Sequence, residues 1–170
     1  MGIKRLFLAF LFVFVPYTAF SAGLDVVNQE VTTVCEPSST NCVRVLRFDI
    51  KADSGDASIR STSVTTANMS KLYGWILMTG SALNGLGGGP TASSVVKLTT
   101  VTEGDILGGS GKTPSAATAG LDIKFRPFTD STLLAPGPYI VSSGLTLTIT
   151  GNAVNSAALT LVFKFLPSRP

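Results

Sequence analysis

Residues 144–165 read GLTLTITGNAVNSAALTLVFKF and carry the clearest structural signal in the chain. Leu and Ile alternate with Thr at positions 145–150, and apolar residues alternate again at positions 159–165, beyond the turn-like sequence GNAVNS. Alternate side chains of a β-strand point to opposite faces of its sheet, so a period of two residues is typical of a strand with one buried face. The stretch therefore predicts two strands whose Leu, Ile and Phe side chains enter a core.

The same alternation recurs along the chain, whereas sustained helical spacing is absent beyond the N-terminal segment. In one segment, for example, Leu46, Phe48 and Ile50 should face inward because they occupy every second position. The segment LYGWILMT is apolar on both faces, which is typical of a strand that crosses the centre of a sheet. The predicted strands are 26–34, 43–50, 58–65, 72–79, 95–101, 121–126, 139–141, 145–150 and 159–165.

Glycine, proline and asparagine separate these strands, at a turn over 53–56 and in longer loops over 80–94 and 127–138. About eight or nine strands at this spacing predict an all-β fold. We expect an antiparallel β-sandwich, either jelly-roll-like or immunoglobulin-like, and keep a closed barrel as the alternative.

The N-terminus has the composition of a secretory signal peptide. Lys4 and Arg5 precede ten apolar residues, 6–15, and small residues follow before a cut that we place after Ser21. An uncleaved membrane anchor is the alternative, but ten residues are about half of the ~20 that a bilayer-spanning helix needs. We therefore predict a signal peptide over 1–21 and one mature domain over 22–170, exported to the periplasm, the cell surface or the extracellular medium.

Charge and cysteine content limit the partners. Two of the 13 basic residues lie in the leader, so the mature domain nearly balances its 10 acidic residues and has no electrostatic signature for nucleic acid or for stable membrane association. Cys35 and Cys42 enclose six residues, EPSSTN, and in an oxidising compartment we expect them to form a disulfide across a hairpin, with two free thiols as the alternative.

The sequence GDILGGSGKT over 104–113 superficially resembles a phosphate-binding P-loop. That motif needs a glycine five residues before Gly111, where this chain has Ile106, and it needs a helix at Lys112, where Pro114 follows instead. We therefore predict a mobile glycine-rich loop between strands, and no nucleotide cofactor.

The chain has no histidine, which excludes catalysis by a nucleophile paired with histidine. Without histidine, its two cysteines cannot supply the four ligands of a tetrahedral zinc site. Two carboxylate pairs remain, Asp53 with Asp56 and Glu103 with Asp105, and both occupy polar turns where such residues are routine. The first pair could also offer oxygen ligands to calcium, although it lacks the spacing of a calcium loop. We predict no catalytic residue, no metal site and no cofactor.

Tyr73 and Trp75 are two residues apart and should share one strand face, where they could form an aromatic platform for a ligand. Core packing explains them as well, and we favour it because tryptophan is usually well buried.

Short motifs in the second half of the chain resemble a group of small phage and prophage structural proteins. The group has an extended segment ending in D-I-L-x-G-x-G, a polar loop and a closing L-T-L-x-I-x-N hairpin. The resemblance spans about residues 55–165 and implies a non-catalytic β-sandwich within an assembly; Thr100 and Glu103 depart from the pattern. The matching residues are Leu98, Asp105, Ile106, Leu107, Gly109, Gly111, Leu145, Thr146, Leu147, Ile149 and Asn152.

These observations favour an exported structural subunit that contacts protein partners, including copies of itself, through loops and strand edges. One alternative is a secreted domain that binds a glycan or peptide through Tyr73, Trp75 or the loop tips. Another is a pilin-like subunit in which an exposed strand edge or residues 24–34 complete a neighbour's sheet. The candidate interaction loops contain Asn84, Gly85, Gly87, Gly88, Gly89, Gly108, Gly109, Gly111 and Lys112.

Overall fold

The structure is a computed structural model that describes residues 26–35, 42–84, 88–91, 94–109, 111, 113, 122–125, 127–130 and 135–168. The predicted leader, 1–21, lies outside these residues.

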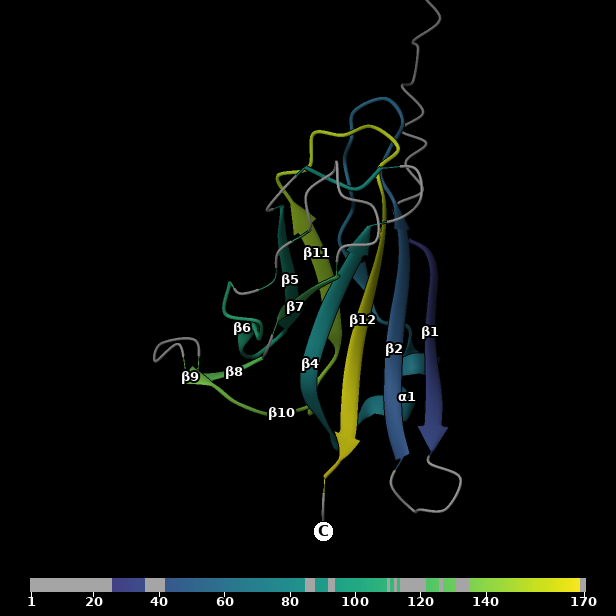
Figure 1. The fold of residues 1–170 in the computed structure, drawn as a ribbon. Coiled ribbons are helices and arrows are strands. Elements are labelled where there is room, and N and C mark those ends of the chain that lie inside the picture. The colour runs from purple at the N-terminus through teal and green to yellow at the C-terminus, as the bar shows by residue number, and fades with distance from the viewer. Residues whose placement is uncertain are drawn as a thin grey trace, which may run out of the picture.

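The larger sheet, which we call sheet A, contains six antiparallel strands (Figure 1). Their spatial order is β1, β2, β12 and β4, and the far edge of β4 pairs with both β10 and β7. The strands are β1 (Val26–Cys35), β2 (Cys42–Lys51), β4 (Trp75–Asn84), β7 (Asp122–Phe125), β10 (Tyr139–Ile140) and β12 (Ala158–Pro167).

The smaller sheet, sheet B, has the order β3, β11, β5 and β6, and β8 pairs with β9 in a separate ribbon. One short helix, α1 (Thr66–Leu72), follows β3. The remaining strands are β3 (Thr62–Ser63), β5 (Val95–Thr100), β6 (Gly104–Asp105), β8 (Phe128–Asp130), β9 (Ala135–Pro136) and β11 (Leu145–Thr150).

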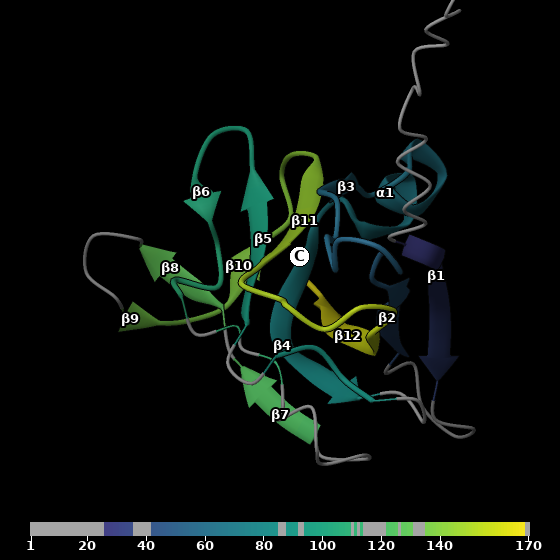
Figure 2. The ribbon, with the colours of Figure 1, turned by 90° about the horizontal axis from the view of Figure 1, so that it is seen from above.

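Side chains from both sheets form one buried cluster. Figure 2 shows the backbone of the two sheets from above. Leu46, Phe48 and Ile50 of β2 enter it as predicted, and the rings of Phe48 and Phe163 meet edge to face with centroids 6.1 Å apart. Sheet B contributes Val96, Leu98, Leu145, Leu147 and Ile149. The prediction of an all-β chain with alternating inward residues is confirmed.

The two C-terminal strands do not form a hairpin, contrary to what the motif resemblance implies. β11 pairs with β5 and β3 in sheet B, whereas β12 inserts between β2 and β4 in sheet A. Residues 151–157 therefore carry the chain from one sheet to the other. Alternation showed which face of each strand is buried, but it does not say which strand is the neighbour.

Three predicted boundaries are wrong. The strand predicted over 58–65 shrinks to β3, because Thr65 begins α1 as its N-cap and accepts a hydrogen bond from Asn68 N. The strand predicted over 72–79 begins at Trp75 and continues to Asn84, so it takes the first residues of the predicted loop 80–94. The predicted connection 127–138 contains the β8–β9 pair.

Candidate interaction surface

The outer face of sheet A carries a row of apolar side chains. Val34 pairs with Val43, Leu166 with Ile76, and Ile76 with Ile140. The pairing of Phe165 with Arg44 puts Leu166 beside Val43, one residue further along. The five side chains therefore cross the whole sheet in register. We call this set, Val34, Val43, Leu166, Ile76 and Ile140, the apolar row.

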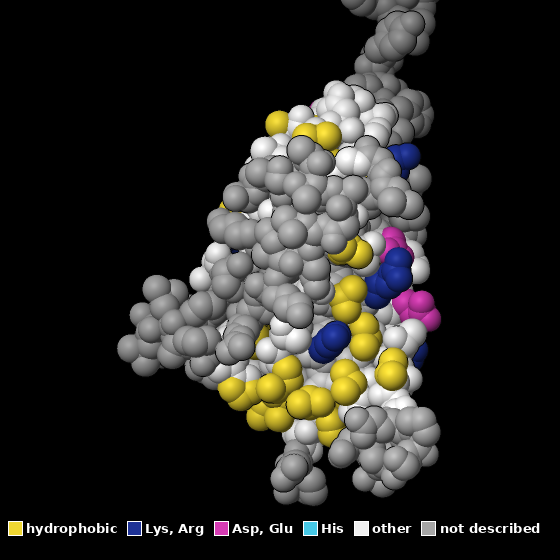
Figure 3. Space-filling view, in the orientation of Figure 1, with side chains coloured by type: hydrophobic (Ala, Val, Ile, Leu, Met, Phe, Trp, Pro, Cys, Tyr) yellow, Lys and Arg dark blue, Asp and Glu magenta, His cyan; other side chains and the backbone are white. Residues whose placement is uncertain are grey.

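Much of the apolar row is open to solvent. Val34 is 59% exposed, Ile140 56% and Leu166 39%, while Val43 and Ile76 are partly buried. Met78 adds to the patch, because a register shift in the pairing of β4 with β12 skips this residue and leaves it 40% exposed. Figure 3 shows apolar side chains gathered at the lower end of this face around a basic side chain. Large contiguous apolar patches on folded domains are typical of interaction sites, so the apolar row is the candidate surface here.

The charged residues of this face are partly neutralised within it. Arg47 donates from Nε and Nη2 to the Asp49 carboxylate at 2.8–3.1 Å, and Thr160 Oγ1 donates to the same carboxylate at 2.9 Å. The hydrogen bond from Arg47 holds the pKa of Asp49 below its usual value, and the same contact raises the pKa of Arg47. Lys164 is exposed between Val162 and Leu166 along β12.

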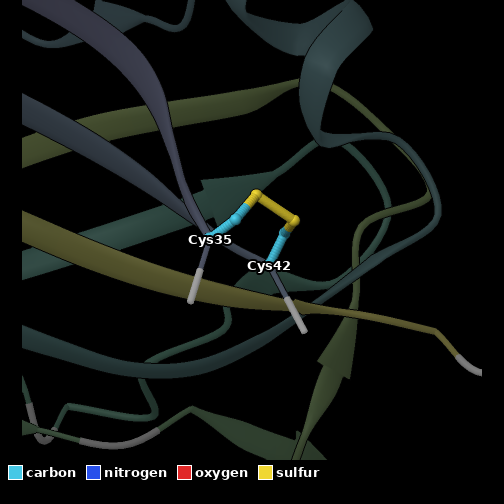
Figure 4. The surroundings of a disulfide bond; sticks show 2 residues. All are labelled: Cys35 and Cys42. Carbon is cyan, nitrogen blue, oxygen red and sulfur yellow. A yellow bond between two sulfur atoms is a disulfide. The ribbon is translucent and has the colours of Figure 1, made fainter. Parts of the chain in front are cut away.

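The disulfide predicted between Cys35 and Cys42 is present at one end of the apolar row (Figure 4). The two residues are direct cross-strand partners with Cα atoms 4.1 Å apart, next to the pair Val34–Val43. The bond therefore fixes the β1–β2 hairpin where the apolar row reaches the edge of the sheet.

Tyr73 and Trp75 do not share a strand face. Tyr73 is the C-cap of α1 and is 51% exposed, and Gly74, with φ +76°, turns the chain before β4 begins at Trp75. Trp75 packs against the core, with the Arg44 guanidinium carbon 4.0 Å from its ring centroid. This stacking is a cation–π contact within the protein and keeps one ring face away from solvent.

The glycine-rich segment over 104–113 is packed rather than free in its described part. Ile106 and Leu107 are buried in the core, and the Asp105 carboxylate accepts hydrogen bonds from Leu107 N and Gly109 N. Gly108, which is partly buried, and Gly109, which is exposed, complete this turn with φ +54° and +75°. These buried and hydrogen-bonded residues differ from the open loop between strands that the sequence suggests.

The end of that segment runs beside β5. Val96 N donates to Gly111 O and Thr113 N donates to Ser94 O, both at 3.0 Å. A Cβ at Gly111 would overlap the Val96 carbonyl, so the chain passes close to β5 only because this residue is glycine. The buried Thr113 hydroxyl donates to Thr91 O, so it is engaged inside the protein. Lys112 lies outside the described residues.

The other predicted loop is also packed. Asn84 and Gly89 are buried against each other, and a Cβ at Gly89 would overlap the Asn84 side chain. Gly88 O accepts a hydrogen bond from Ala158 N of β12. Gly85 and Gly87 lie outside the described residues.

Three of the four carboxylates in the acidic pairs, those of Asp53, Asp56 and Asp105, accept hydrogen bonds from backbone N–H groups of their own turns. The Asp53 carboxylate accepts from Gly55 N and Asp56 N, and Asp56 accepts from Ser58 N at 2.9 Å. The hydrogen bond with Ser58 lowers the pKa of Asp56. Asp105 caps the turn described above. Within the described ranges, no three His, Cys, Asp or Glu side chains lie together as a metal site would need.

The sequence analysis missed the apolar row. A signal was present, because Val43 and Ile76 occupy outward positions of strands whose inward positions are also apolar. Finding the row required the register of five strands, which single-strand patterns do not contain. In the part of the chain that the structure describes, we found no helix long and apolar enough to cross a bilayer.

Comparisons with known proteins add one likeness. No family model matches the sequence, and no curated protein does. Among solved structures, a chain of the "Cyanophage Pam1 capsid asymmetric unit" is similar with a TM-score of 0.42 and 8% identity, over 81% of this chain and 94% of that chain. Membership of a phage structural family stays a prediction from the motifs, and the chain is an all-β protein with an intramolecular disulfide and an apolar row across one sheet.

Proposed function

We propose that the chain is an exported, non-catalytic subunit of an assembly in which copies contact one another through the apolar row. The row is the observation that carries the proposal, because large apolar side chains in register across five strands are costly to leave in water. Val34, Leu166 and Ile140 would each gain about 1 kcal/mol on losing their remaining exposure.

The free energy gained by burying these side chains determines how tightly two copies bind. Association costs an estimated 4–15 kcal/mol in lost translational and rotational freedom. A few apolar side chains offset only part of that cost, so a single contact is weak and depends on concentration. Repeated contacts in an assembly add up, because each further contact forms at a high effective concentration.

Export and the sandwich fold belong to the same proposal. The Cys35–Cys42 disulfide suits an oxidising compartment, as the predicted leader over 1–21 does. The single core with side chains from both sheets suits an antiparallel β-sandwich.

Two other functions have less support. In a pilin-like subunit, residues 24–34 would leave their own sheet, yet β1 pairs with β2 along its length and the disulfide joins them covalently. An aromatic platform for a glycan or peptide would need Tyr73 and Trp75 on one strand face, whereas Tyr73 caps α1 and Trp75 begins β4.

The proposal predicts that a charge within the apolar row weakens association. Sedimentation velocity of the exported protein over a wide concentration range should show large species that diminish in Ile140→Lys and Leu166→Lys. Val101→Lys is the matched control, because Val101 is 92% exposed in the turn after β5 and away from the row. The proposal is wrong if wild type stays monomeric at high concentration, or if the control and the row variants behave alike.

A further inference from the structure

The outer edge of sheet A is formed by β1. Figures 1 and 2 both show β1 as the outermost strand, and its only partner strand among the described residues is β2. Residues 32–35 are all exposed. An exposed strand edge offers backbone N–H and C=O groups to another extended chain.

The disulfide shows which backbone groups point to that edge. Paired residues in an antiparallel ladder alternate between wide pairs, with Cα atoms about 5.5 Å apart, that exchange hydrogen bonds and narrow pairs, at about 4.5 Å, that do not. Cys35 and Cys42 are 4.1 Å apart and so form a narrow pair. Counting back along β1, Thr33, Val31 and Gln29 also stand in narrow pairs and turn their N–H and C=O groups away from β2.

An independent contact confirms this orientation. Gln29 O accepts a hydrogen bond from Asn68 Nδ2 of α1 at 3.2 Å, so it does point away from β2. The Gln29 side chain also bonds Thr65 N and Ser63 O, which fixes the start of α1 against the strand. Val31 is only 6% exposed. The accessible part of the edge is therefore Thr33 and Cys35, and no described backbone hydrogen bond outside the β1–β2 ladder reaches either residue.

We propose that β1 of a second copy pairs antiparallel with this edge about a two-fold axis at Val34, an inference that rests on the proposed function. Thr33 of each copy then exchanges two backbone hydrogen bonds with Cys35 of the other copy. The two Val34 residues form a narrow pair, whose side chains lie closest on the outer face.

The apolar row explains why the partner is a second copy. An exposed edge strand normally carries a charge that blocks pairing, yet this edge presents Val34 at 59% exposure. A two-fold axis at Val34 covers this side chain with its own equivalent and places the two apolar rows in one line across the joined sheets. The disulfide holds the paired residues in place before binding, which lowers the ordering cost.

The sharpest test removes one edge donor. Thr33→Pro deletes an N–H that faces away from β2, so the fold should keep its urea unfolding midpoint while the dimer is lost. Thr32→Pro is the matched control, because Thr32 stands in a wide pair with Val45. Proline there removes a backbone hydrogen bond to β2, so the urea midpoint should fall. The inference is overturned if Thr33→Pro remains dimeric, or if the two variants exchange their effects on stability.

Two more measurements separate edge pairing from other contacts. Val34→Lys should abolish the dimer and Val34→Thr, which keeps the shape, should only weaken it. Hydrogen exchange should show the amides of Thr33 and Cys35 protected in the wild-type dimer and unprotected in Val34→Lys.

Ile140→Lys should remove the larger species and leave the dimer intact. Loss of large species without any effect of the Thr33 and Val34 variants would retain the proposed function and reject the edge-paired dimer.

Discussion

At the scale of single residues, Asp49 is the carboxylate with the best-defined partners. It receives the Arg47 guanidinium from its own strand and the Thr160 hydroxyl from β12. Since Thr160 is also the cross-strand partner of Asp49, the carboxylate links β2 to β12 on the outer face of sheet A. The hydrogen bonds that the Asp49 carboxylate accepts stabilise its charged form, and this lowers its pKa.

This lowered pKa predicts a loss of stability in acid. In the unfolded chain Asp49 should titrate near the ordinary value of about 3.9. Because its pKa is lower in the folded chain, its contribution is fully present above the unfolded value and is lost as the pH falls through the folded value. The side chain is 31% exposed, so we expect less than about 1 kcal/mol. Urea unfolding at pH 7 and pH 3 should show a larger loss of stability in wild type than in Asp49→Asn, which keeps the contribution of Asp56.

A double-mutant cycle supplies the control. Arg47→Met removes the first cause of the pKa shift, so Asp49→Asn should cost less in that background. An equal cost in both backgrounds would mean that Arg47 does not act on Asp49.

Residue-level predictions from the sequence worked where the period of two applies. Phe48 and Phe163 face the core for that reason. Gly111 shows where this reasoning fails, because its closeness to the Val96 carbonyl comes from a contact between segments far apart in the chain. The same limit applies to Tyr73, whose exposure follows from capping a helix that the pattern did not reveal.

At the scale of elements, the crossing from β11 to β12 depends on Asn152. Its amide group donates to Ala57 O at 2.8 Å and Val154 O at 3.1 Å, and its carbonyl oxygen accepts from Thr91 N at 3.0 Å. This one side chain therefore joins the crossing to the loop between β2 and β3 and to the loop before β5.

Asn152→Ala should destabilise the fold by about 2–3 kcal/mol, because it removes several hydrogen bonds and leaves backbone groups without partners. Asn155→Ala is the control in the same loop, since Asn155 is exposed and makes one long bond of 3.5 Å to Gly55 O. Urea unfolding measures both variants. Equal costs would show that Asn152 does not hold the crossing.

The helix α1 and the pairing order could not be read from local patterns. The helix has seven residues, and its buried side chains are Asn68, Met69 and Leu72, which is too short a series to establish a helical period. The N-cap Thr65 was a usable signal, but the run of Ser and Thr before it also suits a strand. Pairing of β12 with β2 and β4 depends on contacts of large sequence separation.

At the scale of the whole molecule, both sheets share one core, which predicts cooperative unfolding. Leu98 of β5 is fully buried in sheet B, and the single tryptophan, Trp75, begins β4 in sheet A. Leu98→Ala should destabilise the fold by about 2–5 kcal/mol through the cavity it leaves. Trp75 fluorescence and far-ultraviolet circular dichroism should move to the same lower midpoint in urea.

The wild-type protein serves as the control, since its two signals should also coincide. If fluorescence kept the wild-type midpoint in Leu98→Ala while circular dichroism shifted, the sheets would unfold as separate units.

The position of β12 has a consequence for how the fold is made. Residues 158–167 fill the middle of sheet A, between two strands that precede them by a long stretch of chain. A growing polypeptide that already contains β2 and β4 therefore has two inner strand borders with nothing to join them, and pairing over such a separation is slow. The β1–β2 hairpin is local, but sheet A is complete only once residues 158–167 lie between β2 and β4. We therefore expect the closing of sheet A to be a late step of folding.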